Sequence, residues 1–113
     1  MPDVEAHVNL LLWKAIYERR LLRLVYKDRE RIVEPHDYGI HNGVGKLFAY
    51  QVGGSSSHKL PAWRWMEEKL ISDIQLLDRK FRGSRPTVSG RHHKWDKVFI
   101  RVQPADEERE SLS

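Results

Sequence analysis

Apolar and polar residues alternate along most of this chain, and no other feature restricts its fold as strongly. In an extended segment, this alternation places apolar side chains on one face and polar side chains on the other. After residue 20, the apolar face carries Leu22, Leu24 and Tyr26. The same period returns toward the C-terminus, in Val98, Ile100 and Val102. The pattern therefore predicts a mainly β protein.

Turn signals divide the alternating region into five or six predicted strands. Residues 28–30 form a short polar turn, and Asn42-Gly43 is the strongest hairpin signal in the chain. Residues 53–57, Gly-Gly-Ser-Ser-Ser, are expected to form a flexible loop. Pro35 has no backbone N–H, so it predicts a sheet edge, a bend or a bulge. The predicted extended segments are 21–27, 31–41, 46–52, 63–66, 70–77 and 95–102.

The N-terminal residues follow a helical period instead, because Val8, Leu12 and Ile16 fall on one stripe. A chain of 113 residues is the length of one ordinary domain. One amphipathic helix followed by five or six short strands predicts a small, strongly bent antiparallel sheet, and closing it into a barrel hides its edges. We expect a single domain at 1–103, with the helix at 4–20 and the barrel at 21–103, and an acidic, disordered tail at 104–113.

The composition excludes several classes of protein. There is no cysteine, which rules out a disulfide scaffold, a thiolate zinc site and a cysteine nucleophile. The six histidines have no recognisable ligand spacing, so we expect neither a metal nor another cofactor. No apolar run approaches the ~20 residues of a membrane span, and the first residues do not resemble a signal peptide. We therefore expect a cytoplasmic protein with no membrane partner.

The net charge of +4 is unevenly distributed along the chain. Residues 1–78 hold 11 basic and 11 acidic residues and are neutral. Residues 79–101 hold eight basic residues against Asp96, a net charge of +7, and the tail from Pro104 carries −3. We call residues 79–101 the basic segment. A concentration of charge of this kind favours binding to a polyanion, and the alternative is a solvated basic loop.

Three stretches in order resemble the WYL domain of bacterial regulators: residues 20–26 (RLLRLVY), 31–36 (RIVEPH) and 49–54 (AYQVGG). The agreement continues at 63–64, 71–78, Phe81 and 85–86, as in a short stand-alone branch of WYL-like proteins. The chain carries Gly-Lys-Leu at 45–47 in place of the namesake Trp-Tyr-Leu, and Leu70 in place of a frequent arginine. The resemblance implies an SH3/Sm-like barrel after one helix, and a role in transcriptional regulation through binding of a ligand, single-stranded nucleic acid or a nucleotide.

The candidate binding residues are bases and aromatic residues of the kind that contact phosphates and nucleobases. Guanidinium groups bind phosphate with two parallel hydrogen bonds, and aromatic rings stack on bases. For the arginines the alternative is an ion pair with Glu67, Glu68 or Asp78, and for the rings it is burial in the core. By resemblance, a histidine after Pro35 would contact the ligand; the alternative is a buried ring bonded to the backbone. The candidates are His36, Tyr38, Trp63, Arg64, Arg82, Arg85, Arg91 and Lys94, with Tyr50, Trp65 and Trp95 as further stacking rings.

We therefore expect a non-catalytic module that binds single-stranded nucleic acid or a nucleotide-like anion through the basic segment. The alternative is an interaction module in which the barrel edges and the N-terminal helix pair with another chain, as in a homo-oligomer. A small ribonuclease using His36 or His93 is a third hypothesis, although no paired carboxylates or phosphate-cradling loop accompany these residues.

Overall fold

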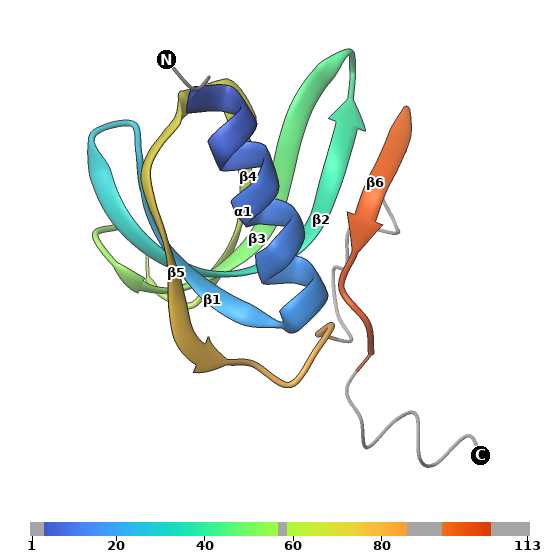
Figure 1. The fold of residues 1–113 in the computed structure, drawn as a ribbon. Helices are drawn as coiled ribbons and strands as arrows, with labels where there is room; N and C mark the ends of the chain where they lie inside the picture. Colours follow the sequence, from blue (N-terminus) through green and yellow to red (C-terminus); the bar gives the residue numbers. More distant parts are fainter. Residues whose placement is uncertain (1–3, 57–58, 86–93, 105–113) are drawn as a thin grey trace, which may run out of the picture.

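The computed structural model describes residues 4–56, 59–85 and 94–104, with the side chains of residues 4–7 excepted. The fold is mainly β, as the alternation predicts, with one helix at the N-terminal end (Figure 1). The elements are α1 (Val4–Glu18), β1 (Arg20–Tyr26), β2 (Arg29–His41), β3 (Val44–Gly54), β4 (Ala62–Glu67), the 3-10 helix η1 (Glu68–Leu70), β5 (Ile71–Lys80) and β6 (Lys97–Arg101).

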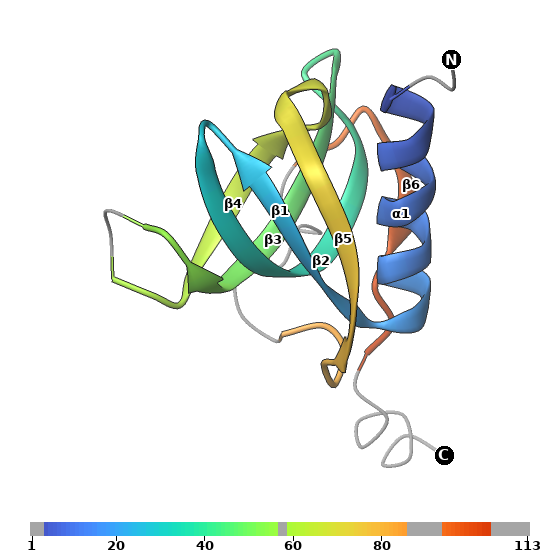
Figure 2. The ribbon, with the colours of Figure 1, turned by 60° about the vertical axis from the view of Figure 1, so that its left-hand side comes forward.

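All six strands belong to one antiparallel sheet with the order β4-β3-β2-β1-β5, and β6 pairs with β2. The sheet is strongly bent, and α1 lies on one side of it with β6 alongside (Figure 2). Within the described residues, β4 and β5 at the two ends of this order do not pair with each other. The expected class and strand number are therefore confirmed, whereas closure into a barrel is not.

Strand β2 changes its partner halfway along its length. Residues 29–33 pair with β1, and residues 37–40 pair with β6, while β3 accompanies almost the whole strand. The β2–β3 register shifts between Pro35 and Asp37, which confirms the irregularity predicted at Pro35. Since proline offers no N–H to a ladder, it is tolerated where the pairing is interrupted.

Most strand boundaries differ from the sequence-based expectations by a few residues, and three differences have a clear backbone cause. The hairpin at Asn42 and Gly43 is confirmed, with φ of 52° and 76°, the left-handed pair that a two-residue turn requires. The preceding turn lies at Lys27 and Asp28, one residue early, because Tyr26 pairs with Arg29 and leaves two residues between the strands. The predicted loop at 53–57 was wrong at its start, since β3 runs to Gly54 and stays paired with β2. The helix ends at Glu18 instead of residue 20, because Arg19 adopts a left-handed φ of 55°.

The core lies between α1 and one face of the sheet. The apolar stripe of α1 is buried as predicted, and it packs against alternate residues of β1, β2 and β3 together with Met66 of β4. The buried cluster includes Val8, Leu12, Ala15, Ile16, Leu22, Leu24, Val33, Tyr38, Leu47, Ala49 and Met66. No helix among the described residues has the length and apolar character needed to cross a bilayer.

Candidate functional site

The face of β3 and β4 opposite the core carries a ladder of aromatic rings. Along β3, Phe48 and Tyr50 alternate with the core residues Leu47 and Ala49, so they point to the other side of the sheet. Strand β4 contributes two tryptophans in register with them, Trp65 opposite Phe48 and Trp63 opposite Tyr50. Trp95, just before β6, extends the ladder. We call Phe48, Tyr50, Trp63, Trp65 and Trp95 the aromatic face.

The rings of the aromatic face contact one another continuously. Trp63 lies parallel to Phe48 with 4.8 Å between ring centroids, and it contacts Tyr50 at 4.9 Å. Trp65 lies 4.7 Å from Phe48 and 5.3 Å from Trp95. Phe48 is buried, whereas the three tryptophans and Tyr50 are half-buried. Each of these four side chains therefore keeps part of its surface open to solvent.

Both described ends of the connection from β5 to β6 lie against this face. On the β5 side, the Arg85 guanidinium lies 4.1 Å from the centroid of Tyr50. The Phe81 ring stacks at 5.5 Å on His36, whose ring contacts Trp63 at 4.8 Å. On the β6 side, Trp95 contacts Trp65 and, at 5.7 Å, His41. The basic segment is thus anchored on the aromatic face by residues from both of its halves.

One lysine lies over the aromatic face. The ammonium of Lys46 lies 5.6 Å from the Trp65 ring and 3.2 Å from Nδ1 of His41. Lys94 is exposed and precedes Trp95, whereas the Lys97 ammonium lies 5.9 Å from the ring of Phe99, which packs against the core. Asp96 faces the hairpin instead, because its carboxylate accepts a hydrogen bond from the Gly43 N–H at 2.7 Å.

Two arginines of the basic segment are held by buried acids of β2. Arg85 donates to both carboxylate oxygens of Glu34, at 2.8 and 2.9 Å, and these hydrogen bonds raise the pKa of Arg85. Arg101 donates from Nε to Oδ1 of the buried Asp37 carboxylate. The ion-pair alternative for Arg85 therefore holds, but its partner is Glu34 and not Glu67, Glu68 or Asp78. A base paired with a buried acid adds little net charge to the surface.

His36 is a buried structural residue rather than a surface contact. Only 1% of its surface is exposed, and burial lowers its pKa. Its Nδ1 faces the Glu34 carbonyl at 2.9 Å and its Nε2 faces the Arg85 N–H at 3.2 Å. The carbonyl can only accept and the amide can only donate, which assigns a neutral ring protonated on Nδ1. His36 therefore ties the chain at Arg85 to β2, and both of its ring nitrogens are occupied.

Tyr38 is also part of the core, and this corrects its prediction as a stacking ring. It pairs with the core residue Leu47 of β3, its side chain points from β2 into the core, and it is fully buried. Its hydroxyl donates to Oε1 of Glu68 at 2.8 Å and accepts from the Asn9 side chain at 2.6 Å. Burial, followed by the bond to Glu68, raises the pKa of Tyr38 well above its ordinary value. This ring joins α1, β2 and η1, and no nucleobase can reach it.

The remaining candidates do not converge on one point. Trp63 belongs to the aromatic face, and Lys94 precedes Trp95. Arg64 lies between Trp63 and Trp65 in β4, so it points to the opposite face of that strand. Arg82 is exposed, and its carbonyl accepts a hydrogen bond from Arg19 at 3.1 Å. Arg91 and His93 lie outside the described residues.

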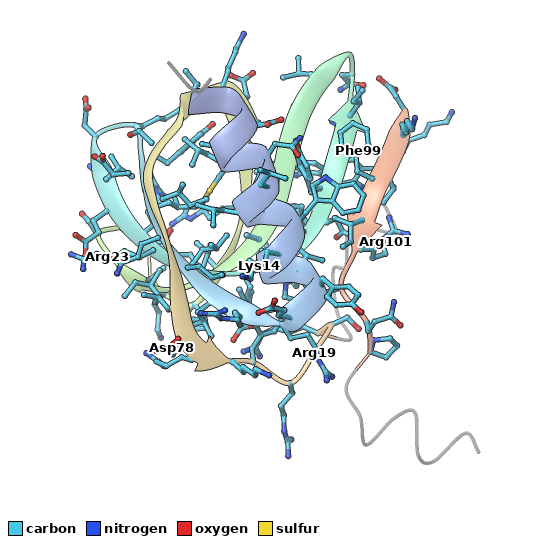
Figure 3. The ribbon with its side chains drawn as sticks, viewed as in Figure 1. Lys14, Arg19, Arg23, Asp78, Phe99 and Arg101 are labelled. Carbon is cyan, nitrogen blue, oxygen red and sulfur yellow. The ribbon has the colours of Figure 1, made fainter. Side chains whose placement is uncertain are left out.

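A cavity of about 260 Å³ opens between the bulge of β2 and the chain after β6. Its charged groups are Asp37 and Arg101, which pair with each other, so its lining is close to neutral. Arg101 lies on the β6 side of the molecule, below Phe99 in Figure 3. The lining residues are His36, Asp37, Ser84, Arg101, Val102, Gln103 and Pro104.

Sequence reasoning missed Arg31 and Gln51, which contact each other at one end of the core face. The alternation of the strands contained a signal for this group. Arg31 lies two residues before the core residue Val33, and Arg64 lies two residues before Met66, so both arginines point to the core face. Charged residues are rarely buried without a partner, so two arginines on the core face indicate a polar site there. Within the described residues, no group of three or more His, Asp or Glu side chains is placed to hold a metal ion.

No protein-family model, curated protein or solved structure matches this chain. The resemblance to WYL domains therefore stays a prediction from the sequence motifs.

Proposed function

We propose that this protein is a non-catalytic module that binds single-stranded nucleic acid on its aromatic face. The observation that carries this proposal is the row of four half-buried rings, Tyr50, Trp63, Trp65 and Trp95, which the buried Phe48 joins into one contact chain and over which Lys46 lies. Sequence-tolerant binding of single strands combines stacking rings with positive charge in this way. The resemblance to WYL domains supports a regulatory use of such binding.

Trp65 is the centre of the proposed stacking surface. It contacts Phe48 and Trp95 through its ring and has the Lys46 ammonium within 5.6 Å. These neighbours hold the indole in place, so a base stacking on its open part would cost little ordering of the protein. Stacking on one such ring contributes about 1–3 kcal/mol per base.

Lysines supply the phosphate contacts in this proposal. Glu34 and Asp37 neutralise Arg85 and Arg101, so these two arginines contribute mainly to structure. Lys94 is exposed beside Trp95, and Lys46 lies over Trp65. Two lysines that contact phosphates would release counterions and make the affinity fall with added salt.

Fluorescence anisotropy with a labelled single-stranded oligonucleotide tests the proposal. The affinity of the wild-type protein should fall between about 50 and about 200 mM salt. Trp65→Ala should weaken binding about tenfold or more, since one stacked base is lost. Trp13→Ala is the matched control, because Trp13 lies on α1 and should leave the affinity unchanged.

Three results would count against this function. They are no binding at either salt, equal binding by the Trp65→Ala and wild-type proteins, and equal losses in the Trp65→Ala and Trp13→Ala variants. A labelled RNA should also be recovered intact after incubation, and cleavage would overturn the non-catalytic assignment.

A second candidate function, self-association, is favoured by the outer side of α1. Leu10, Trp13 and Tyr17 are 67%, 39% and 80% exposed, although all three are large apolar or aromatic residues. Their spacing of three and four places them on one stripe of the helix, beside the exposed Lys14 that Figure 3 marks. Such a stripe can pair with the same stripe of a second copy across a two-fold axis.

Light scattering distinguishes this candidate from the first. A dimer that dissociates in the Leu10→Gln, Tyr17→Gln double variant would support self-association through α1. A strict monomer at all concentrations would reject it, as well as pairing through the terminal strands β4 and β5.

A further inference from the structure

Two arginines converge on one neutral oxygen at the end of the core face. Oε1 of Gln51 accepts a hydrogen bond from Nη1 of Arg31 at 3.1 Å and another from Nε of Arg64 at 3.1 Å. Arg31 comes from β2, Gln51 from β3 and Arg64 from β4, so three neighbouring strands build this group. The side chain of Gln51 is fully buried. We call Arg31, Gln51 and Arg64 the arginine pair site.

Other contacts fix each member of this site. The Gln51 amide nitrogen donates to the carbonyls of Gly53 and Ser55, at 2.9 and 3.0 Å, which forces its oxygen toward the arginines. Arg64 donates from Nη2 to Oγ of Ser56 at 2.7 Å. The Arg31 guanidinium lies 5.6 Å from the centroid of the Tyr26 ring. Both guanidinium groups are thus positioned before any ligand arrives.

The positive charge of this site is not neutralised by the described part of the chain. Across residues 4–56, 59–85 and 94–104, no carboxylate contacts Arg31 or Arg64. The neighbouring Glu30 pairs with Arg23 at 2.7 Å instead. Burial lowers the pKa of Arg31, and the charges of Arg64 and Arg29 lower it further. Two like charges held together with only an amide between them favour the arrival of an anion.

Hydrogen-bonding capacity remains on both guanidinium groups. Nη2 of Arg31 and Nη1 of Arg64 have no hydrogen-bond partner among the described residues. Guanidinium N–H groups match the tetrahedral oxygens of phosphate well, and two arginines suit a doubly charged group.

We propose that the arginine pair site binds a phosphate monoester group between Arg31 and Arg64. The group belongs either to a small phosphorylated molecule or to the terminal phosphate of a nucleic-acid strand. Arg64 points away from the face that Trp63 and Trp65 share, so this site does not depend on binding at the aromatic face.

Calorimetric titration of the full chain with inorganic phosphate, at constant ionic strength, tests the site. The wild-type protein should bind with a dissociation constant below about 1 mM. Arg31→Gln and Arg64→Gln should each weaken binding about tenfold or more, because each removes a charged donor. Arg79→Gln is the matched control: it removes the same charge from an exposed position of β5, a strand that pairs with β1 and lies at the far end of the sheet order from β4, and it should leave binding unchanged.

Several outcomes would overturn the proposal: no binding up to about 10 mM phosphate, undiminished binding by Arg31→Gln or Arg64→Gln, or an equal loss in Arg79→Gln. If a glutamine variant fails to fold, as judged by circular dichroism, Arg64→Lys replaces it. Lysine keeps the charge but loses the planar fork, so weaker binding is expected and unchanged binding would reject the site.

Oligonucleotides with and without a 5′-phosphate then identify the source of the group. If the site binds a strand end, the phosphorylated oligonucleotide binds more tightly than the unphosphorylated one. Arg64→Gln should abolish this difference in affinity, and Trp65→Ala should preserve it. Equal binding of the two strands, with inorganic phosphate still bound, assigns it to a small phosphorylated molecule. Failure of oligonucleotide binding alone rejects the aromatic face and leaves the arginine pair site standing.

Discussion

Two pairs of arginines in this molecule have opposite electrostatic surroundings. Arg85 and Arg101 each bond to a buried carboxylate of β2, Glu34 or Asp37. Arg31 and Arg64 share the oxygen of a neutral amide. The first pair belongs to the basic segment, whereas the second lies in the part of the sequence that is neutral overall. The local partner, and not the charge of the surrounding sequence, decides which bases are available to an anion.

The four arginines should therefore respond differently when their charge is removed. Removing a base from a buried acid leaves that acid uncompensated, which costs stability. Removing one of two neighbouring bases relieves their repulsion, and the neutral acceptor loses only one hydrogen bond. We therefore expect substitutions of the first pair to lower stability, and substitutions of the second pair to lower anion binding.

The largest effect is expected for Arg101→Gln. Only 2% of the Asp37 side chain is exposed, so its carboxylate would be left buried and unpaired. The free energy of unfolding should fall by about 2 kcal/mol, less than for a fully buried pair because the Arg101 side chain is 38% exposed. Urea denaturation measures the change. Adding Asp37→Asn should recover part of the loss, and no recovery would mean that Arg101 acts through packing alone.

Arg85→Gln should lower the free energy of unfolding by about 1 kcal/mol in the same assay. Glu34 is slightly more exposed than Asp37, so its unpaired carboxylate is less costly. A loss larger than that of Arg101→Gln would reverse the order expected from burial. Phosphate binding at the arginine pair site should be unaffected.

His36 should make the Arg85 side of the molecule sensitive to pH. Its pKa is lowered in the folded state by burial, so the unfolded chain binds a proton more readily. The stability that this residue contributes is present above pH ~6.5 and is lost as the pH falls below that value. Thermal denaturation should show a smaller decrease in His36→Gln, whose amide can replace both hydrogen bonds. An equal decrease in both proteins would assign the pH dependence to other groups.

The smallest effect on stability is expected for Arg64→Gln, within about 0.5 kcal/mol of the wild type. Its hydrogen-bond partners Gln51 and Ser56 are neutral, so the change leaves no uncompensated charge. Urea denaturation should show this small shift while calorimetry shows the loss of phosphate binding. A decrease of more than about 1 kcal/mol in the free energy of unfolding would show that Arg64, like Arg85 and Arg101, mainly stabilises the fold.

The sequence predicts the elements of this fold well and the side-chain partners poorly. Alternation, the Asn42-Gly43 turn and Pro35 are local signals, and local backbone preferences fix them. The pairing of Arg85 with Glu34 joins residues 51 positions apart, and that of Arg101 with Asp37 joins residues 64 apart. Such contacts depend on which strands become neighbours, and the order of strands in the sheet is not a local property.

The candidate site shows the same limit. The tryptophans are predicted as possible stacking rings from their type alone, and the structure places Trp63 and Trp65 on one face of β4. Tyr38 is the same type of residue, but its phase in β2 directs it into the core. Arg31 was missed because its neutral partner Gln51 comes from another strand.

The change of partner within β2 has a consequence for the order in which the chain can fold. The hairpins that β2 forms with β1 and β3 close over short distances in the sequence, so they can form early. The end of β2 must wait for β6, some sixty residues further along, and closing so long a loop is slow. During synthesis, the Tyr38 end of the core stays uncovered by Phe99 and Ile100 until β6 has left the ribosome. Among the described strands, β6 is therefore made last, and it completes this end of the core.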